Sequence, residues 1–309
     1  MEIERRIWEG NSGDEQVGRG LFSIVYRRDG VRAVKVSVPE DEQPPHDSFR
    51  EVEILRKCRH DNVIELLDVF TRVNLDDEEE LVQVMPYIPF DLNRVLQKHR
   101  KSAFPTGWRN TLPEALSESI VLQIARALEY LHGNGIIHRD IKPENILIDE
   151  NDRVKLIDFG ISWDQTTSNN GNEPADKKIL DVCTTVYRPP ETLMGLRNYD
   201  FSLDLWSFGC VVCKIFSSDC SDLFGDYHGD IRLISTQVQT IGTPTLETWP
   251  DAKNSSSFQN LSFESFPGLP PKQLAPRAPQ KLLPIVSGLL KYQGSDRITP
   301  LHIINILSN

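Results

Sequence analysis

The chain has 309 residues, of which 39% are hydrophobic and 26% are charged. This length can form a large folded body, which we expect to have two lobes around one cleft. The formal net charge is −11, from 34 Lys and Arg residues against 45 Asp and Glu residues. An acidic chain is a poor candidate for binding nucleic acid or an anionic membrane, whereas it can bind basic or neutral protein substrates.

The cysteines and the first residues indicate the cellular compartment of the protein. Five cysteines, an odd number in a long chain, do not indicate a disulfide framework, so we expect a reducing compartment. The start, MEIERRIWEG, has no apolar signal core, and no apolar run reaches the length of about 20 residues that a membrane span needs. We therefore expect an intracellular protein, of the cytoplasm or the nucleus, with no membrane partner.

The first part of the chain, residues 14–85, is predicted to form mostly strands. IVYRRDGVRAVKV (24–36) contains two β-rich runs joined by an Asp-Gly pair, which is typical of a hairpin. One helix is predicted at 48–60, where apolar residues recur at helical spacing. LVQVMPYI (81–88) is predicted as a buried strand that ends at a proline-containing connection.

The rest of the chain is predicted to be mainly helical. Amphipathic helices are expected at 91–100 and 116–132, with a surface loop at 101–114 between them. Residues 241–284 are rich in Pro and Ser, so we expect extended, irregular structure there. The apolar end, from 282 to 307, predicts two more helices.

The strongest chemical signal is HRDIKPEN, which is followed by DFG, within residues 138–160. Phosphoryl transfer requires positioning, neutralisation of the phosphates and a group that orients the attacking hydroxyl. Asp140 can accept the hydroxyl proton, and Lys142 can lie beside the transferring phosphate. These two residues are therefore candidate catalytic residues.

Two further residues of this segment are candidate metal ligands. Asn145 and Asp158 offer the hard oxygen ligands that suit Mg²⁺. Residues 145–157 are predicted to form two short strands joined by a turn, and such a hairpin would bring both side chains close together.

Upstream, GRGLFSIV (18–25) has the pattern of a glycine-rich loop over phosphates, with Gly18 and Gly20 allowing backbone N–H groups to approach an anion. The pattern alone also fits an ordinary turn. Lys35 follows in the next strand, and Glu51 on the predicted helix is its natural partner. An ion pair between them would hold Lys35 against the α- and β-phosphates as a third catalytic residue.

In this order, the motifs resemble those of the eukaryotic protein kinases over nearly the whole chain. The matching positions are Gly18, Gly20, Lys35, Glu51, Asp140, Asn145, Asp158 and PPE at 189–191. The resemblance implies one α+β kinase domain, with a small β-rich N-lobe (1–87) over a larger, mainly helical C-lobe (88–309). It also implies ATP and Mg²⁺ as cofactors in the cleft between the lobes.

The resemblance further implies which residues hold the nucleotide. Met85 falls at the gatekeeper position, Pro86 to Ile88 at the hinge, and Val25, Ala33 and Leu147 around the adenine. The full nucleotide set is Gly18, Gly20, Val25, Ala33, Lys35, Glu51, Met85, Pro86, Ile88, Asp91 and Leu147. Outside it, Asp204 is expected to steady the catalytic loop, and Glu191 and Arg297 to pair structurally.

Other segments resemble the serine/threonine branch and its cyclin-dependent-kinase-like group. Lys142 and Pro143 fit the serine/threonine branch, and PHDSFRE (45–51) stands where this group has its cyclin-contacting helix. VYRPPETLMG (186–195) and QTIGTPTLETWP (239–250) resemble the end of the group's activation segment and a C-lobe segment.

The chain departs from that group at its phosphorylation switches. Ile179 occupies the place of the activating threonine, and Leu21 and Phe22 replace the inhibitory Thr-Tyr pair. Two of the three arginines that clamp the activating phosphate remain, Arg50 and Arg139.

The third arginine position is Trp163. Two exposed arginines without a phosphate would repel each other, so we predict that an acidic side chain lies between them. The candidates are Glu173, Asp176 and Asp181.

A kinase without these switches can be constitutively active, as the monomeric CDK-activating kinases of fungi are, which this chain resembles. That resemblance implies a monomer whose protein substrate is the activation-loop threonine of a cyclin-dependent kinase. Two alternatives remain: a kinase that needs a cyclin, docked near Phe49, and a pseudokinase scaffold. The presence of all the expected catalytic residues argues against the scaffold.

Overall fold

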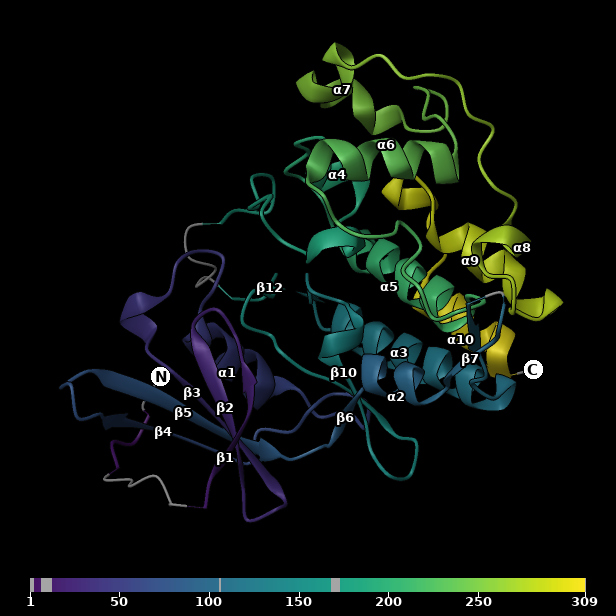
Figure 1. Ribbon diagram of the computed structural model, residues 1–309. Helices are drawn as coiled ribbons and strands as arrows, with labels where there is room; N and C mark the ends of the chain where they lie inside the picture. Colours follow the sequence, from purple (N-terminus) through teal and green to yellow (C-terminus); the bar gives the residue numbers. More distant parts are fainter. Residues whose placement is uncertain (1–2, 7–12, 106, 168–172, 309) are drawn as a thin grey trace.

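The computed structural model describes residues 3–6, 13–105, 107–167 and 173–308. It has a smaller lobe built on a sheet and a larger helical lobe (Figure 1). This arrangement confirms the predicted bilobal α+β fold. None of the helices in the described ranges is long and apolar enough to cross a membrane.

The smaller lobe is a five-stranded antiparallel sheet in the order β1-β2-β3-β5-β4 with one helix, α1, beside it (Figure 1). Its elements are β1 (Glu15–Arg19), β2 (Ser23–Arg28), β3 (Arg32–Ser37), α1 (Ser48–Lys57), β4 (Asp68–Val73) and β5 (Glu79–Pro86). The turn between β2 and β3 holds Asp29 and Gly30 at φ of 49° and 77°, which confirms the predicted hairpin. Helix α1 begins at the predicted residue, where the Asp47 side chain accepts a hydrogen bond from Arg50 N–H, and it ends three residues early.

The larger lobe contains the remaining helices. They are α2 (Leu92–Lys98), α3 (Glu114–Gly133), α4 (Pro190–Leu193), α5 (Ser202–Ile215), α6 (Asp230–Ile241), α7 (Ser256–Asn260), α8 (Pro271–Leu274), α9 (Leu283–Leu289) and α10 (Pro300–Ser308). The two predicted C-terminal helices are α9 and α10. Residues 241–284 contain only short helical segments joined by irregular chain, close to the expectation.

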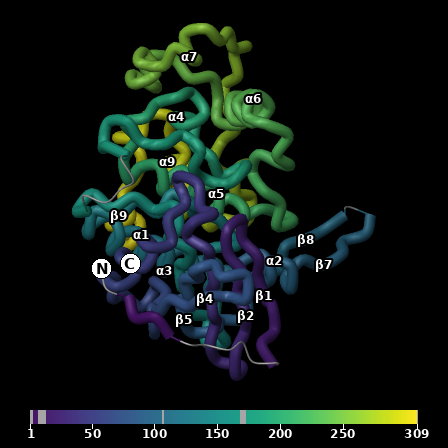
Figure 2. The backbone as a smooth tube through the Cα atoms, turned by 90° about the vertical axis from the view of Figure 1, so that its left-hand side faces the viewer, coloured from purple at the N-terminus to yellow at the C-terminus, as the bar shows by residue number. Residues whose placement is uncertain are grey.

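The larger lobe also contains short strands. They are β6 (Phe90–Asp91), β7 (Arg100–Ser102), β8 (Trp108–Asn110), β9 (Ile136–Ile137), β10 (Ile146–Ile148), β11 (Val154–Leu156) and β12 (Trp163–Asp164). The predicted hairpin within 145–157 is confirmed, because β10 pairs antiparallel with β11. The predicted surface loop at 101–114 is partly wrong, since β7 and β8 form a hairpin that extends away from the lobe (Figure 2).

One apolar core runs through both lobes. Ile54, Leu55 and Cys58 at the end of α1 are buried with Met85 of β5, in the same cluster as the buried faces of α3, α5 and α9. Since each lobe contributes to this core, α1 and the sheet pack directly against the larger lobe.

A buried ion pair joins α4 to the chain between α9 and α10, and the sequence resemblance implies this pair. Arg297 donates to Glu191 from both terminal nitrogens, at 2.6 and 2.7 Å, and its side chain is 0% exposed. Arg297→Met leaves the Glu191 carboxylate buried without its cation, so we expect the free energy of unfolding to fall by about 3–5 kcal/mol.

Chemical denaturation measures this loss. The matched control is Lys281→Met, which breaks the exposed Lys281–Glu118 pair, where the expected loss is about 1 kcal/mol or less. Equal losses for the two variants would contradict the structural role of Glu191 and Arg297.

Candidate active site

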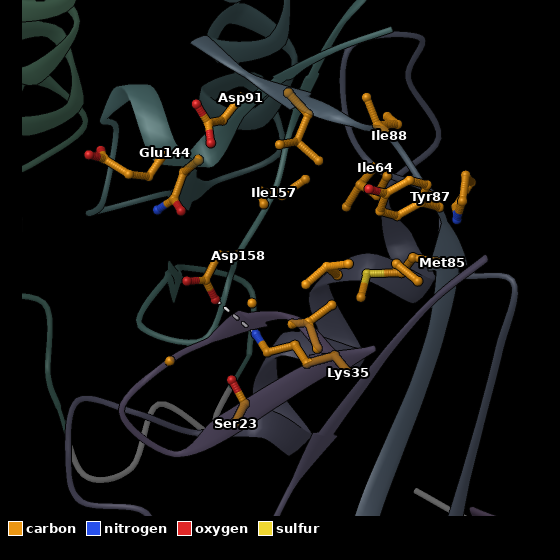
Figure 3. Close-up of a pocket in the computed structure, with 18 of the residues that line it drawn as sticks. Ser23, Lys35, Ile64, Met85, Tyr87, Ile88, Asp91, Glu144, Ile157 and Asp158 are labelled. Carbon is orange, nitrogen blue, oxygen red and sulfur yellow. Dashed lines mark hydrogen bonds and ion pairs between the residues drawn. The ribbon is translucent and has the colours of Figure 1, made fainter. Parts of the chain in front are cut away.

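A cavity of about 460 Å³ lies between the two lobes (Figure 3). Among the residues that line it are Gly18, Gly20, Val25, Ala33, Lys35, Glu51, Met85, Pro86, Ile88, Asp91, Lys142, Asn145, Leu147 and Asp158. The structure therefore brings to one cavity every residue that the sequence nominated for the nucleotide or the metal. Asp140 does not line the cavity itself but contacts two residues that do, Lys142 and Asn145.

Several lining residues were not predicted from the sequence. Val17, Ile64 and Ile157 add apolar surface to the cavity. Val17 and Ile157 directly precede Gly18 and Asp158 in the sequence. This adjacency to the motifs is a signal from which both could have been predicted. Ile64 lies in irregular chain after α1 and carries no local signal. The cavity wall is thus more apolar than the motifs indicate, as a site for a flat aromatic ring requires.

The glycine-rich loop is tight at Gly20. Its backbone N–H donates to the carbonyl oxygen of Ser23 at 2.8 Å, and a Cβ atom at this position would lie 2.9 Å from the Ser23 hydroxyl oxygen. A larger residue would therefore require the Ser23 side chain to rotate away. Ser23, which replaces the third glycine of the family pattern, lies at the rim of the cavity (Figure 3).

Lys35 joins β3 to α1 and to the DFG segment. Its Nζ atom lies 2.9 and 2.8 Å from the two carboxylate oxygens of Glu51. The same atom lies 2.9 Å from Oδ1 of Asp158 (Figure 3). Glu51 is 2% exposed and also accepts hydrogen bonds from the side chain of Gln83 and from Phe159 N–H. The predicted Lys35–Glu51 pair is therefore present, and Asp158 is a second partner.

The charges of this cluster set its protonation state. The positive charge of Lys35 lowers the pKa of Asp158 to about 2, against the opposing effect of burial. Burial alone would lower the pKa of Lys35, but the charges of Asp158 and Glu51 raise it above its ordinary value. Lys35 and Asp158 therefore both stay charged at neutral pH.

Asp204 of α5 fixes the backbone of the catalytic loop. It is 0% exposed and accepts hydrogen bonds from the backbone N–H groups of His138 and Arg139, at 2.9 and 2.8 Å. His132 lies 2.9 Å from the same carboxylate. Arg139 has a φ of 68°, a conformation that is costly for a residue with a side chain. Because Asp204 holds this turn, Asp140 is presented in one orientation.

Asp140 is surrounded by three polar groups. Its carboxylate accepts a hydrogen bond from the side-chain amide of Asn145 at 2.9 Å and from Thr184 Oγ1 at 2.7 Å. Lys142 Nζ lies 2.7 Å from both Asp140 and Thr184. Thr184 was not predicted from the sequence, because it reaches Asp140 only through the fold of the activation segment.

The residues nominated as metal ligands fit a divalent cation. Asn145 uses its amide nitrogen to donate to Asp140, so its amide oxygen remains available as a ligand. Asp158 engages Lys35 through Oδ1, and its other carboxylate oxygen has no hydrogen bond among the described residues. Two hard oxygens match Mg²⁺, which keeps several waters and usually takes one or two protein oxygens.

The acidic group predicted beside the arginines is Glu173. Its carboxylate pairs with both terminal nitrogens of Arg139, and its Oε1 accepts the backbone N–H of Ile179 at 2.6 Å. The Trp163 indole donates to the Glu173 carbonyl oxygen at 3.1 Å. Glu173 thus ties the catalytic loop to the backbone of Ile179 in the activation segment.

The other parts of that prediction are corrected. Asp176 and Asp181 are exposed, and neither forms a described contact with Arg139. Arg50 and Arg139 are 3% and 0% exposed, so the expectation of exposed arginines is wrong. Arg50 donates instead to the carbonyl oxygens of Pro45 and Gly160.

Helix α1 contacts the DFG segment at its start and strand β12 at its end. At its start, Asp47 N–H donates to the carbonyl oxygen of Gly160 at 2.9 Å. At its end, Lys57 pairs with the buried Asp164 of β12 at 2.9 Å. These two contacts join α1 to the segment that follows the catalytic loop, and the Lys35–Glu51 pair joins it to β3 of the sheet.

Comparison with known proteins identifies the family. The protein kinase domain matches residues 12–306 of this chain. The chain belongs to the protein kinase family. The cavity, the Lys35–Glu51 pair and the loop that carries Asp140 all lie within the matched residues.

Relatives of this kinase are serine/threonine kinases. The serine/threonine-protein kinase csk1 of Schizosaccharomyces pombe is 32% identical over 278 residues, which cover 88% of this chain and 83% of that protein. The probable cyclin-dependent kinase 8 of Dictyostelium discoideum is 28% identical over 306 residues, with 92% and 76% covered. The mitogen-activated protein kinase spk1 of S. pombe is 29% identical over 293 residues, with 92% and 73% covered. The protein is accordingly a serine/threonine kinase that uses ATP and a divalent metal.

Proposed function

We propose that this kinase is a constitutively active CDK-activating kinase, which phosphorylates the activation-loop threonine of a cyclin-dependent kinase and works as a monomer. The observation that carries the proposal is the buried Glu173–Arg139 pair, because it supplies a negative charge at the activating position without phosphorylation. The contacts at both ends of α1 add support, since they hold Glu51 on Lys35 without a partner chain.

In the proposed mechanism, the residues around the cavity act by positioning and charge. Asp140 accepts the proton of the substrate hydroxyl as the hydroxyl oxygen attacks the γ-phosphorus, while the bond from that phosphorus to the β,γ-bridging oxygen breaks and ADP leaves. Lys142 stabilises the charge on the phosphoryl oxygens. Lys35 binds the α- and β-phosphates while Glu51 fixes its direction. Asn145 and Asp158 would hold Mg²⁺, which neutralises phosphate charge.

The apolar lining residues have a role of their own in this proposal. Val25, Ala33 and Leu147 contact the adenine, Met85 is the gatekeeper, and Pro86 to Ile88 form the hinge. Gly18 and Gly20 bring backbone N–H groups to the phosphates, and Asp91 lies at the ribose end of the cavity.

A cyclin-dependent kinase is the second candidate. Phe49 on α1 is 36% exposed, which leaves an apolar side chain available on the face where that group binds cyclin. A pseudokinase scaffold is disfavoured, because Lys35, Glu51 and Asp158 are already in contact with one another.

Phosphate transfer by the purified kinase tests the proposal. We expect the monomer to transfer phosphate from Mg-ATP to a cyclin-dependent kinase with an intact activation-loop threonine, with no cyclin added. A Thr→Ala version of that substrate and an Asp140→Asn version of this enzyme are the controls, and both should show no transfer. Transfer that begins only when a cyclin is supplied would favour the second candidate, and light scattering would report whether the active species is a monomer.

A further inference from the structure

The tip of the glycine-rich loop contacts the segment that leads into α1. The Phe22 ring packs edge-on against the His46 ring, with centroids 5.0 Å apart and an interplanar angle of 65°. Its neighbour Leu21 is 78% exposed, so the loop turns one of its two large tip residues inward. An edge-to-face pair at this distance is a favourable aromatic arrangement.

His46 lies in a hydrogen-bonded turn directly before α1. Its backbone N–H donates to the Gln43 carbonyl oxygen at 2.9 Å. The next residue, Asp47, caps α1 through Arg50 N–H and donates its own N–H to Gly160 of the DFG segment. The segment that carries His46 is therefore joined to α1 and to the DFG segment.

Phe22 and His46 close a small recess at the phosphate end of the cavity. The recess has a volume of about 60 Å³, and its lining includes Lys35, Glu51 and Asp158. Burial lowers the pKa of His46, with smaller opposing contributions from Asp158 and Asp140 and reinforcing ones from Lys35 and Arg50. A neutral imidazole adds no positive charge beside Lys35 and acts by packing.

We propose that His46 is a positioning residue that holds the glycine-rich loop closed over the nucleotide phosphates through its contact with Phe22. A loop built on Gly18 and Gly20 has little conformational preference of its own, so an attachment at its tip lowers the cost of ordering it around a ligand. Because the attachment lies on the segment bound to Gly160, loop closure depends on the same α1 position that pairs Lys35 with Glu51. The inference applies to nucleotide binding and does not depend on which protein is the substrate.

A double-mutant cycle on ADP binding tests this inference. We expect Phe22→Ala and His46→Ala each to raise the Kd for ADP, measured by calorimetry with Mg²⁺ present, by between about twofold and about tenfold, the range that one aromatic pair supplies. The double variant should bind ADP as weakly as either single variant, since both remove the same contact. His46→Phe should bind like the wild type.

The control is His60→Ala, which removes another partly buried histidine that stacks on an aromatic ring, Tyr130, at 4.9 Å. It should leave the ADP affinity unchanged. Thermal unfolding of the nucleotide-free variants distinguishes loop positioning from a purely structural role of His46. A purely structural role would lower the Tm without changing the Kd for ADP. Independent effects of Phe22→Ala and His46→Ala, or an unchanged Kd for His46→Ala, would overturn the inference.

Discussion

Asp158→Asn is expected to abolish most of the phosphate transfer while the protein remains folded. The change removes the negative charge that we assign to the metal, and loss of several kcal/mol of charge stabilisation corresponds to a fall in kcat of about 10³-fold or more. Lys35 keeps Glu51 as a partner, so the fold should tolerate the amide. Turnover measured at saturating Mg-ATP, with circular dichroism and Tm on the same samples, tests both parts.

The pKa of Asp158 determines how the activity and the stability of the Asp158→Asn variant should differ from those of the wild type as the pH changes. Because that pKa is lowered to about 2, the carboxylate is ionised throughout the neutral range and should give no acidic limb in the activity profile between about pH 5 and 8. A lowered pKa stabilises the fold above the unfolded-state pKa of about 4, and that contribution is lost as the pH falls towards 2. The Asp158→Asn variant should therefore lose less stability over that interval than the wild type. Normal turnover by the variant would exclude Asp158 as a metal ligand.

Much of this site could be predicted because its residues stand in short motifs with a fixed local geometry. Lys35 and Glu51 are 16 residues apart, but a strand followed by a helix that packs on the same sheet leaves few other partners for either one. Asn145 and Asp158 are joined by the β10–β11 hairpin, which the sequence itself predicts. In these cases the local elements determine the contact.

Other features depend on contacts between segments that are distant in the sequence. Ile64 reaches the cavity, and Thr184 reaches Asp140, only after both lobes and the activation segment have folded. The β7–β8 hairpin contains Gly, Pro and charged residues, so its strands carry little of the alternating pattern that predicts a strand. Glu173 was one of three acidic candidates, and charge alone could not distinguish it from Asp176 and Asp181.

Glu173→Gln is expected to impair both stability and catalysis, because it leaves Arg139 buried without a counter-charge. Both side chains are almost completely buried, at 0% and 2% exposure, and removing one charge of such a pair costs about 3–5 kcal/mol of unfolding free energy. Arg139 directly precedes Asp140, so a shifted loop misplaces the group that orients the hydroxyl. Displacements of this kind lower kcat on the order of 10²-fold.

Asp176→Asn is the matched control, since it removes an exposed carboxylate from the same segment and should change neither quantity by much. Treating the wild-type enzyme with a phosphatase should also leave kcat unchanged, because the charge beside Arg139 belongs to a carboxylate. If the phosphatase abolished turnover, or if Glu173→Gln turned over like the wild type, the negative charge that activates this kinase would have to come from elsewhere. If instead only Glu173→Gln fails, the buried carboxylate performs the task that phosphorylation performs in related kinases, and the absence of a phosphorylatable residue at Ile179 follows from it.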